Sequence, residues 1–176
     1  MPDLHLPDTP KIPLARYLKQ AKDDTKAQAS VIAPDSVKVT TDSEITMTEA
    51  SSLDTWLQTA PQSQTEITIP ENYNDSTPIK IIGPKTTGGN VLIHVGANAH
   101  VALQERWASR GEMLGVCVEL DADEGAQIDW LSYDAFDADM VILQRYARLG
   151  KDVHLNWTVA GFSHNSGASL LTTDLN

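Results

Sequence analysis

The feature that most constrains the fold is a 27-residue period in the second half of the chain. The segments 91–103, 118–130 and 145–157 each begin 27 residues after the one before. Apolar and polar residues alternate within each segment, which is typical of a strand with one buried face. A short turn that contains a glycine (Gly96, Gly125 or Gly150) interrupts the alternation once in every period. Each period therefore predicts two strands joined by a tight turn.

The inward positions of the three aligned segments form columns of similar character. These columns are Val91–Val118–Arg145, Ile93–Leu120–Ala147, Val95–Ala122–Leu149, Ala99–Ala126–Val153, Val101–Ile128–Leu155 and Leu103–Trp130–Trp157. Arg145 is the exception to their apolar character, and the two tryptophans are expected in the core. The outward neighbours His100, Gln127 and His154 are polar. Columns of this kind indicate that each strand stacks on its equivalent one period away.

We therefore predict a flattened parallel β-helix with 27-residue coils and two strands per coil. Strands are expected at 66–70 and 78–83, so that the β-helix occupies 66–176. The later strand pairs are expected at 91–95 with 99–105, at 114–121 with 126–132, and at 140–147 with 153–159. An antiparallel sandwich of three similar hairpins is the competing fold. It needs the alternation but gives no reason for a fixed period.

Residues 1–65 are predicted to form a small α+β region. Leu14, Tyr17, Leu18 and Ala21 have helical spacing, which predicts a short helix near 12–23. Other expected elements are a hairpin of 37–40 with 44–48, a second short helix that begins at Ser51 or Ser52 and carries Leu53, Trp56 and Leu57, and a linker at 59–65.

The last segment, 169–176, reads as the start of another strand, and no capping helix is predicted after residue 160. An open last coil leaves backbone N–H and C=O groups unpaired, which invites pairing with another chain. We therefore expect the chain to be a truncated β-helix or to be completed by another subunit, and we expect self-association through this end.

Charge limits the classes of partner that the chain can bind, and cysteine content bears on its cellular location. The formal net charge is −11, and residues 114–139 hold eight acids and no base. Nucleic acid is an unfavourable partner, because binding it requires clustered Lys and Arg. A basic protein surface or cations would fit better, although a solvated acidic face is the simpler interpretation. A single cysteine, with no secretory signal and no apolar run of membrane-spanning length, leads us to expect a cytosolic protein.

Three short stretches partly resemble known calcium-binding, catalytic or phosphate-binding motifs, but none of them matches its motif completely. A calcium loop counted from Asp121 would need Gly and Glu where Ala126 and Ser132 stand. Residues 161–165 resemble a nucleophile elbow for four positions but end in Asn, so a turn explains them better. The stretch 83–89 lacks the order of a phosphate-binding loop.

Histidine and cysteine positions do not combine into a predicted site. His100 and His154 share a column but are two coils apart, roughly 10 Å at the spacing of stacked strands, which is too far for one ion. With His94 they are read as part of a polar outer surface. Cys117 lies on a predicted strand and is read as a small core or surface residue. We predict no catalytic, cofactor-binding or metal-binding residue, and no enzyme.

Three stretches carry a resemblance to the SufB/SufD family, the scaffold subunits of the Suf iron–sulfur cluster assembly machinery. They are VGANAHVALQERW, then CVELDADEGAQIDWLSYDAF, then LGKDVHLNWTVAGFSHNSGASLLTTDL. The segment PIKIIG (78–83) resembles the stretch that enters the family's core. The resemblance covers about 66–176 and rests on the order and spacing of these motifs together. The region before residue 66 lacks the long helical lead typical of SufB, so SufD is the better match.

The resemblance implies a right-handed parallel β-helix, here with only its first coils, followed in the family by a C-terminal helical segment. It implies a non-catalytic scaffold that pairs with a SufB-like subunit and carries a copy of the Suf ATPase. The family's cluster-building Cys and His positions and its ATPase-binding surface would lie beyond residue 176. No functional residue is therefore transferred, and no cofactor is expected in this chain. The alternative function is a stand-alone β-solenoid module that binds a small molecule or a glycan.

Overall fold

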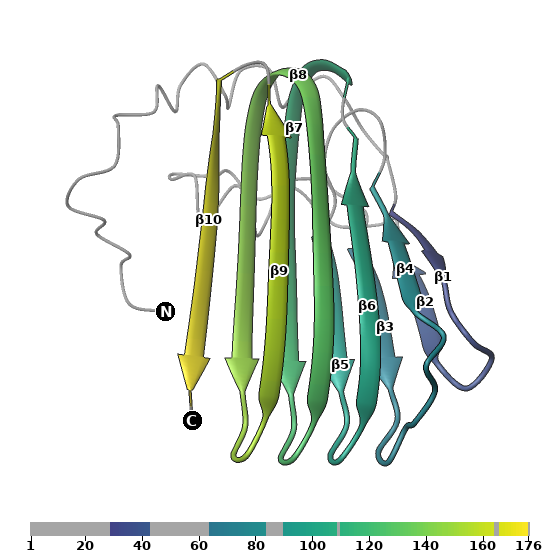
Figure 1. Cartoon of the computed structure of the whole chain (residues 1–176). Coiled ribbons are helices and arrows are strands. Elements are labelled where there is room, and N and C mark those ends of the chain that lie inside the picture. The colour runs from purple at the N-terminus through teal and green to yellow at the C-terminus, as the bar shows by residue number, and fades with distance from the viewer. Residues whose placement is uncertain (1–28, 43–63, 84–89, 109, 164–165, 176) are drawn as a thin grey trace.

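The computed structural model describes residues 29–42, 64–83, 90–108, 110–163 and 166–175, and the described part is mainly β (Figure 1). The strands are β1 (Ser30–Ile32), β2 (Lys38–Asp42), β3 (Gln64–Ile69), β4 (Ile79–Ile82), β5 (Asn90–Val95), β6 (His100–Trp107), β7 (Arg110–Ala122), β8 (Gln127–Leu149), β9 (His154–Ser163) and β10 (Ser166–Leu175). Within these ranges no helix is present, and hence none that could cross a membrane.

Two stacks of parallel strands form the walls of a solenoid of about three turns. The wall here named sheet A runs β4, β6, the first part of β8, then β9. The wall named sheet B runs β3, β5, β7, the second part of β8, then β10. Parallel pairing throughout both stacks excludes the antiparallel sandwich and confirms the predicted parallel β-helix.

The strand registers confirm the predicted columns. Val91 pairs with Val118 and Val118 with Arg145, and the same 27-residue step joins Leu103 to Trp130 and Trp130 to Trp157. The column that begins at Ala99 lies in the turns, where the backbone N–H of Gln127 donates to the Ala99 carbonyl at 2.8 Å. Alternating side chains from both walls fill the lumen, which is the space that they enclose.

Strand β8 differs from the prediction of two separate strands at 126–132 and 140–147. It is continuous from Gln127 to Leu149 and passes from sheet A into sheet B over the end opposite the tight turns (Figure 1). Buried positions are even-numbered up to Ala138 and include the odd-numbered Val141 and Leu143 beyond it. The inward face therefore changes at the bend, and the chain rounds this end without a break in its strand.

The first coil consists of β3 and β4, which confirms the strands expected at 66–70 and 78–83. Strand β3 begins at Gln64, so the last two residues of the predicted linker belong to the strand. The predicted strand at 37–40 is present as β2, and it pairs antiparallel with β3, while β1 pairs antiparallel with β4. These two strands cover the edges of the first coil. The helices expected near 12–23 and after Ser51, and the strand at 44–48, lie outside the described residues.

The tight turns use one left-handed position in every coil. It is held by Asn72, Asn98, Gly125 and Asp152, with φ between 55° and 74°. These are the residue types that adopt positive φ at least cost. Gly96 and Gly150 stand two residues earlier in their turns, where a Cβ would lie 2.6 Å and 2.9 Å from backbone atoms of the preceding turn. The predicted turn glycines therefore serve two different purposes.

The inward side chains of the final described strands are accessible to solvent. Val159 of β9 is 43% exposed, and Leu171 and Leu175 of β10 are 50% and 81% exposed. Strand β9 and strand β10 each pair with β8 alone among the described strands. This end of the solenoid, named here the β9–β10 end, therefore combines apolar side chains with strand edges.

Candidate functional site

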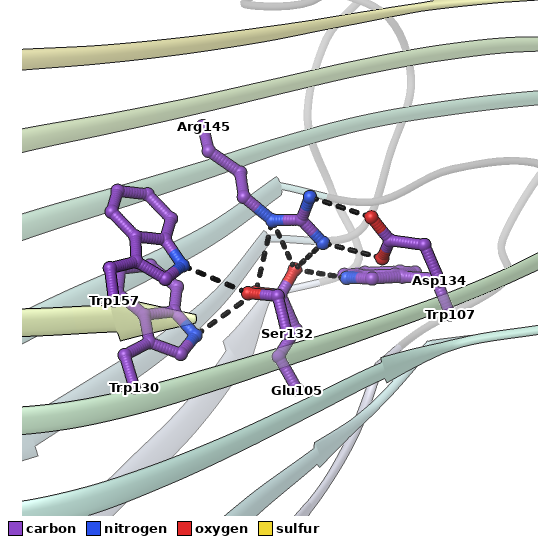
Figure 2. A network of polar contacts seen from close by, with 7 residues as sticks. All are labelled: Glu105, Trp107, Trp130, Ser132, Asp134, Arg145 and Trp157. Carbon is purple, nitrogen blue, oxygen red and sulfur yellow. Dashed lines mark hydrogen bonds and ion pairs between the residues drawn. The ribbon is translucent and has the colours of Figure 1, made fainter. Parts of the chain in front are cut away.

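Three charged side chains lie inside the solenoid rather than on its surface. Glu105 of β6 and Asp134 of β8 point inward from sheet A, and Arg145 of β8 points inward from sheet B (Figure 2). They are 1%, 2% and 1% exposed. Each occupies an inward position of its strand, two or four residues from an apolar core residue. Strand alternation therefore forces these charges into the lumen.

The guanidinium of Arg145 joins the two carboxylates across the lumen. Its Nη1 donates to Asp134 Oδ2 at 2.9 Å, and its Nη2 donates to Asp134 Oδ1 at 2.6 Å. Its Nε and Nη2 donate to Glu105 Oε1 at 3.1 Å and 3.0 Å. The planar fork of donors on arginine suits bidentate pairing of this kind. One side chain of sheet B is thus tied to two strands of sheet A.

Neutral donors complete the coordination of Glu105. Trp130 Nε1 donates to Oε2 at 3.1 Å, Ser132 Oγ donates to Oε2 at 2.8 Å, and the Trp107 indole N–H donates to Oε1. Trp157 of the following coil donates from Nε1 to Ser132 Oγ at 3.0 Å. The seven side chains Glu105, Trp107, Trp130, Ser132, Asp134, Arg145 and Trp157 are named here the lumen network (Figure 2).

The lumen network carries two formal negative charges and one positive charge at positions that are almost fully buried. Burial alone would lower the pKa of the Arg145 guanidinium, but hydrogen bonds and charges from Asp134 and Glu105 outweigh it and raise the pKa above its ordinary value. The second carboxylate charge is offset by the indole and hydroxyl donors around Glu105. Hydrogen bonds to a carboxylate stabilise its charged form.

Two packing features hold the tryptophans of the lumen network in place. The rings of Trp130 and Trp157 stack with centroids 4.1 Å apart and an interplanar angle of 7°. Trp107 occupies space that a side chain at position 83 would fill, because a Cβ on Gly83 would lie 1.8 Å from a Trp107 ring carbon. The absence of a side chain at Gly83 therefore makes room for the indole that bonds Glu105.

The arrangement favours structure over chemistry. Both oxygens of each carboxylate accept hydrogen bonds, and each charged group is almost fully excluded from solvent. A general acid or base must reach a substrate proton, and neither carboxylate has that access. In the described ranges no three His, Cys, Asp or Glu side chains are close enough together to form a metal-binding group.

A shallow depression of about 180 Å³ lies on the outer face of sheet B. Its lining includes Glu66, Leu92, His94, Glu119, Asp121, Tyr146 and Arg148. Arg148 forms an ion pair with Asp121 at 3.1 Å, and Tyr146 donates to Asp174. The charge of Asp121 raises the pKa of Arg148, and the hydrogen bond to Asp174 raises the pKa of Tyr146. Arg148 and Asp121 are each about half exposed and neutralise one another.

The residues weighed from the sequence lie on several faces of the molecule. His100, Gln127 and His154 form the predicted outer column, since each pairs with the next along sheet A. His94 lines the depression on sheet B. Cys117 is buried on β7, and its Sγ lies 3.8 Å from Glu119 Oε1. The structure thus distributes these side chains and does not gather them.

Two sequence interpretations need correction. The acidic run at 114–139 was expected to be a solvated face, and most of its acids are at the surface, but Asp134 is buried in the lumen network. Residues 161–165 were expected to form a turn, but 161–163 continue strand β9, while 164–165 lie outside the described residues. The burial of Asp134 was not expected from the sequence, because acidic side chains usually lie at the protein surface.

Sequence reasoning did not assemble the lumen network. It identified Arg145 as the exception in an apolar column and placed Trp130 and Trp157 inward. Counting in steps of two from Leu103 and Trp130 would also have placed Glu105 and Asp134 inward. The sequence alone could therefore have indicated a buried ionic cluster, because alternation places two acids and one arginine on inward positions.

Comparisons with known proteins yield no relative for this chain: no family model, no curated protein and no solved structure matches it.

Proposed function

We propose that this chain is a SufD-like scaffold subunit of the Suf iron–sulfur cluster assembly complex. The observation that carries the proposal is the order and spacing of the motifs in 66–176 that resemble the SufB/SufD family. The parallel solenoid observed over the same residues agrees with the fold that the resemblance implies. The saturated, inaccessible lumen network supports a scaffold role over a catalytic one. Such a scaffold acts in the cytoplasm, presents rigid walls to partner subunits, and has no active site of its own.

The proposed partners are a SufB-like subunit and the Suf ATPase. The resemblance implies that the SufB-like subunit is bound through the β-helix and that the ATPase is bound by the full-length protein. In the 176-residue chain, the exposed Val159 and Leu171 and the strand edges at the β9–β10 end suit strand addition from another copy of the chain, which is the expected self-association.

Co-expression tests this proposal. The full reading frame that contains these residues is tagged and produced with the SufB-like protein and the Suf ATPase of the same organism, beside the 176-residue chain. Retention of both partners by the long form, with loss of the ATPase by the 176-residue chain, is the expected result. Retention of neither partner by either form would overturn the proposal.

Light scattering of the 176-residue chain tests the expected self-association. Val159→Lys places a charge on the inward face of β9 at the β9–β10 end, and we expect it to abolish the self-association. Thr158→Lys is the matched control, because Thr158 is the adjacent exposed residue on the outward face of β9. A strictly monomeric wild-type chain at high concentration, or equal association by both variants, would contradict a contact through this end.

Reconstitution tests the expected lack of a cofactor in this chain. The isolated 176-residue protein is incubated anaerobically with iron and sulfide, and bound iron and visible absorbance are measured. We expect no stoichiometric cluster. A stoichiometric cluster would show that this segment holds cluster ligands and is more than a scaffold.

One observation favours the second candidate function, a solenoid module that binds a small molecule or a glycan. Tyr133 and Phe162 are exposed on the outer face of sheet A, with ring centroids 5.9 Å apart, and the Arg106 guanidinium lies 6.0 Å from the Tyr133 ring. Exposed aromatic rings can stack on sugars or flat ligands. A glycan array probed with the wild-type chain and with Phe162→Ala tests this function: binding lost in the variant would support it.

A further inference from the structure

Apolar burial alone specifies the strand register of this solenoid poorly, because similar apolar side chains repeat along each wall. Along sheet B, Ile93, Leu120 and Ala147 stack in one column, and the next column also holds only small or aliphatic residues. A slip of two residues between neighbouring strands keeps every apolar side chain on the inner face. Slipped pairings would therefore cost little in the apolar columns.

The lumen network is the part of the core that a slip would break. Glu105 pairs in register with Ser132, and both belong to the network. Arg145 reaches Glu105 and Asp134 from the opposite wall at 3.0 Å and 2.6 Å. A slip of two residues moves a strand by roughly 6.6 Å, which separates these partners beyond hydrogen-bonding distance.

The cost of such a separation falls on buried charges. A carboxylate or guanidinium left unpaired inside a protein is far less tolerable than a mismatched aliphatic contact. Only the observed register satisfies both carboxylates and the guanidinium together. Trp157 extends the same constraint to the next coil through Ser132.

We infer that the lumen network determines the strand register of the solenoid, while the apolar columns supply most of its stability. A single buried polar residue has this role in coiled coils, where it selects one alignment among several of similar stability. The inference concerns folding specificity, and it does not rest on the proposed scaffold function.

Paired cysteines read out the register directly. In a Cys117→Ser background, Ala102→Cys with Asp129→Cys joins neighbours of the observed register, and Ala102→Cys with Leu131→Cys joins neighbours after a two-residue slip. Each pair is introduced into the 176-residue chain with and without Glu105→Gln, Asp134→Asn and Arg145→Met. The triple replacement removes every charge of the network and keeps one amide oxygen at position 105 as an acceptor for the indole and hydroxyl donors.

After refolding and oxidation, we expect the charged chain to form only the observed-register disulfide. We expect the charge-free chain to form both disulfides. Formation of only the observed-register disulfide by the charge-free chain would overturn the inference. Leu120→Ala is the control, because it weakens an apolar column and should leave the disulfide pattern unchanged.

A milder variant covers the case in which the charge-free chain fails to refold. Asp134→Asn removes one carboxylate charge and leaves Arg145 bonded to Glu105. We expect it to form the slipped disulfide above the wild-type level. If the charge-free chain does not fold and Asp134→Asn forms no slipped disulfide, the inference is also overturned.

Discussion

The two halves of the lumen are built on different principles. The half next to the tight turns repeats from coil to coil, with Val95 over Ala122 over Leu149 in one column. The half that holds the lumen network does not repeat, since Glu105, Ser132 and Val159 succeed one another in a single column. Repetition is sufficient to bury a core. The departure from repetition specifies how the coils align.

The lumen network also differs from the rest of the core in how completely its polar atoms are hydrogen-bonded. Among the described side chains, the buried atoms with no hydrogen-bond partner are Thr65 Oγ1, Tyr73 OH and Asn90 Oδ1. None of them belongs to the lumen network. Unpartnered atoms thus occur outside the network, in or beside the first two coils, while the most highly charged part of the core is fully paired. Four substitutions test this contrast.

Arg145→Met should have the largest effect on stability. It leaves Glu105 and Asp134 buried without their cation, and breaking a buried ion pair from one side costs about 4 kcal/mol. Urea unfolding at neutral pH measures the loss. Arg148→Met is the control on the same strand, since its ion pair with Asp121 is about half exposed and should contribute less than about 1 kcal/mol. Equal losses of unfolding free energy in both variants would show that the buried ion pairs of Arg145 stabilise the fold no more than the exposed ion pair of Arg148.

Leu120→Ala should come next. Leu120 is 1% exposed in a repeating column, and truncating a buried leucine costs about 3 kcal/mol. The loss should appear in the same urea experiment. Leu131→Ala on the outer face of sheet A is the control and should change the free energy of unfolding little. A greater loss of unfolding free energy in Leu120→Ala than in Arg145→Met would contradict the expected order of the two effects.

Gly83→Ala tests the space beneath Trp107. The added Cβ would overlap the indole ring, and overpacking of a well-filled core costs about 2 kcal/mol. Gly161→Ala is the matched control, because nothing lies within 4 Å of a Cβ at that position. Thermal unfolding of both variants measures the difference. No difference between them would mean that Trp107 moves aside without loss of its bond to Glu105.

Tyr73→Phe should have the smallest effect, and it should be favourable. The Tyr73 hydroxyl is buried with no hydrogen-bond partner, so its removal should raise the free energy of unfolding by about 1 kcal/mol. Burial, and then the charge of Asp75, raise the pKa of Tyr73. The folded state therefore holds this proton more tightly, and the associated stability is lost as the pH rises above the ordinary tyrosine pKa of 10.0.

Phenylalanine at position 73 has no proton to lose. The advantage of Tyr73→Phe over wild type should therefore grow between neutral pH and pH values above 10, and urea unfolding across this range measures it. Tyr133→Phe on the exposed outer face of sheet A is the control. A constant difference between wild type and Tyr73→Phe at all pH values would contradict the buried, unpartnered state of the hydroxyl.

The periodic part of this fold was predictable, because stacking requires each inward position to repeat in kind. The columns from Val91 to Trp157 follow from that requirement. The continuity of β8 was not predictable, because its inward face changes between Ala138 and Val141 and the alternation loses phase there. The partners of Arg145 were missed because they come from the opposite wall, and the period relates only residues of the same wall.

The tight turns, with their left-handed position at Asn98, Gly125 and Asp152, bear on how such a chain can change length during evolution. Duplication or deletion of one whole 27-residue unit keeps the same face of every strand inward. It also keeps every tight turn in line with the turns of the neighbouring coils. Loss or gain of a single residue inside a strand would turn the rest of that strand inside out. Gene rearrangements that survive selection should therefore add or remove complete coils, and solenoids of this design should differ in length by multiples of one coil.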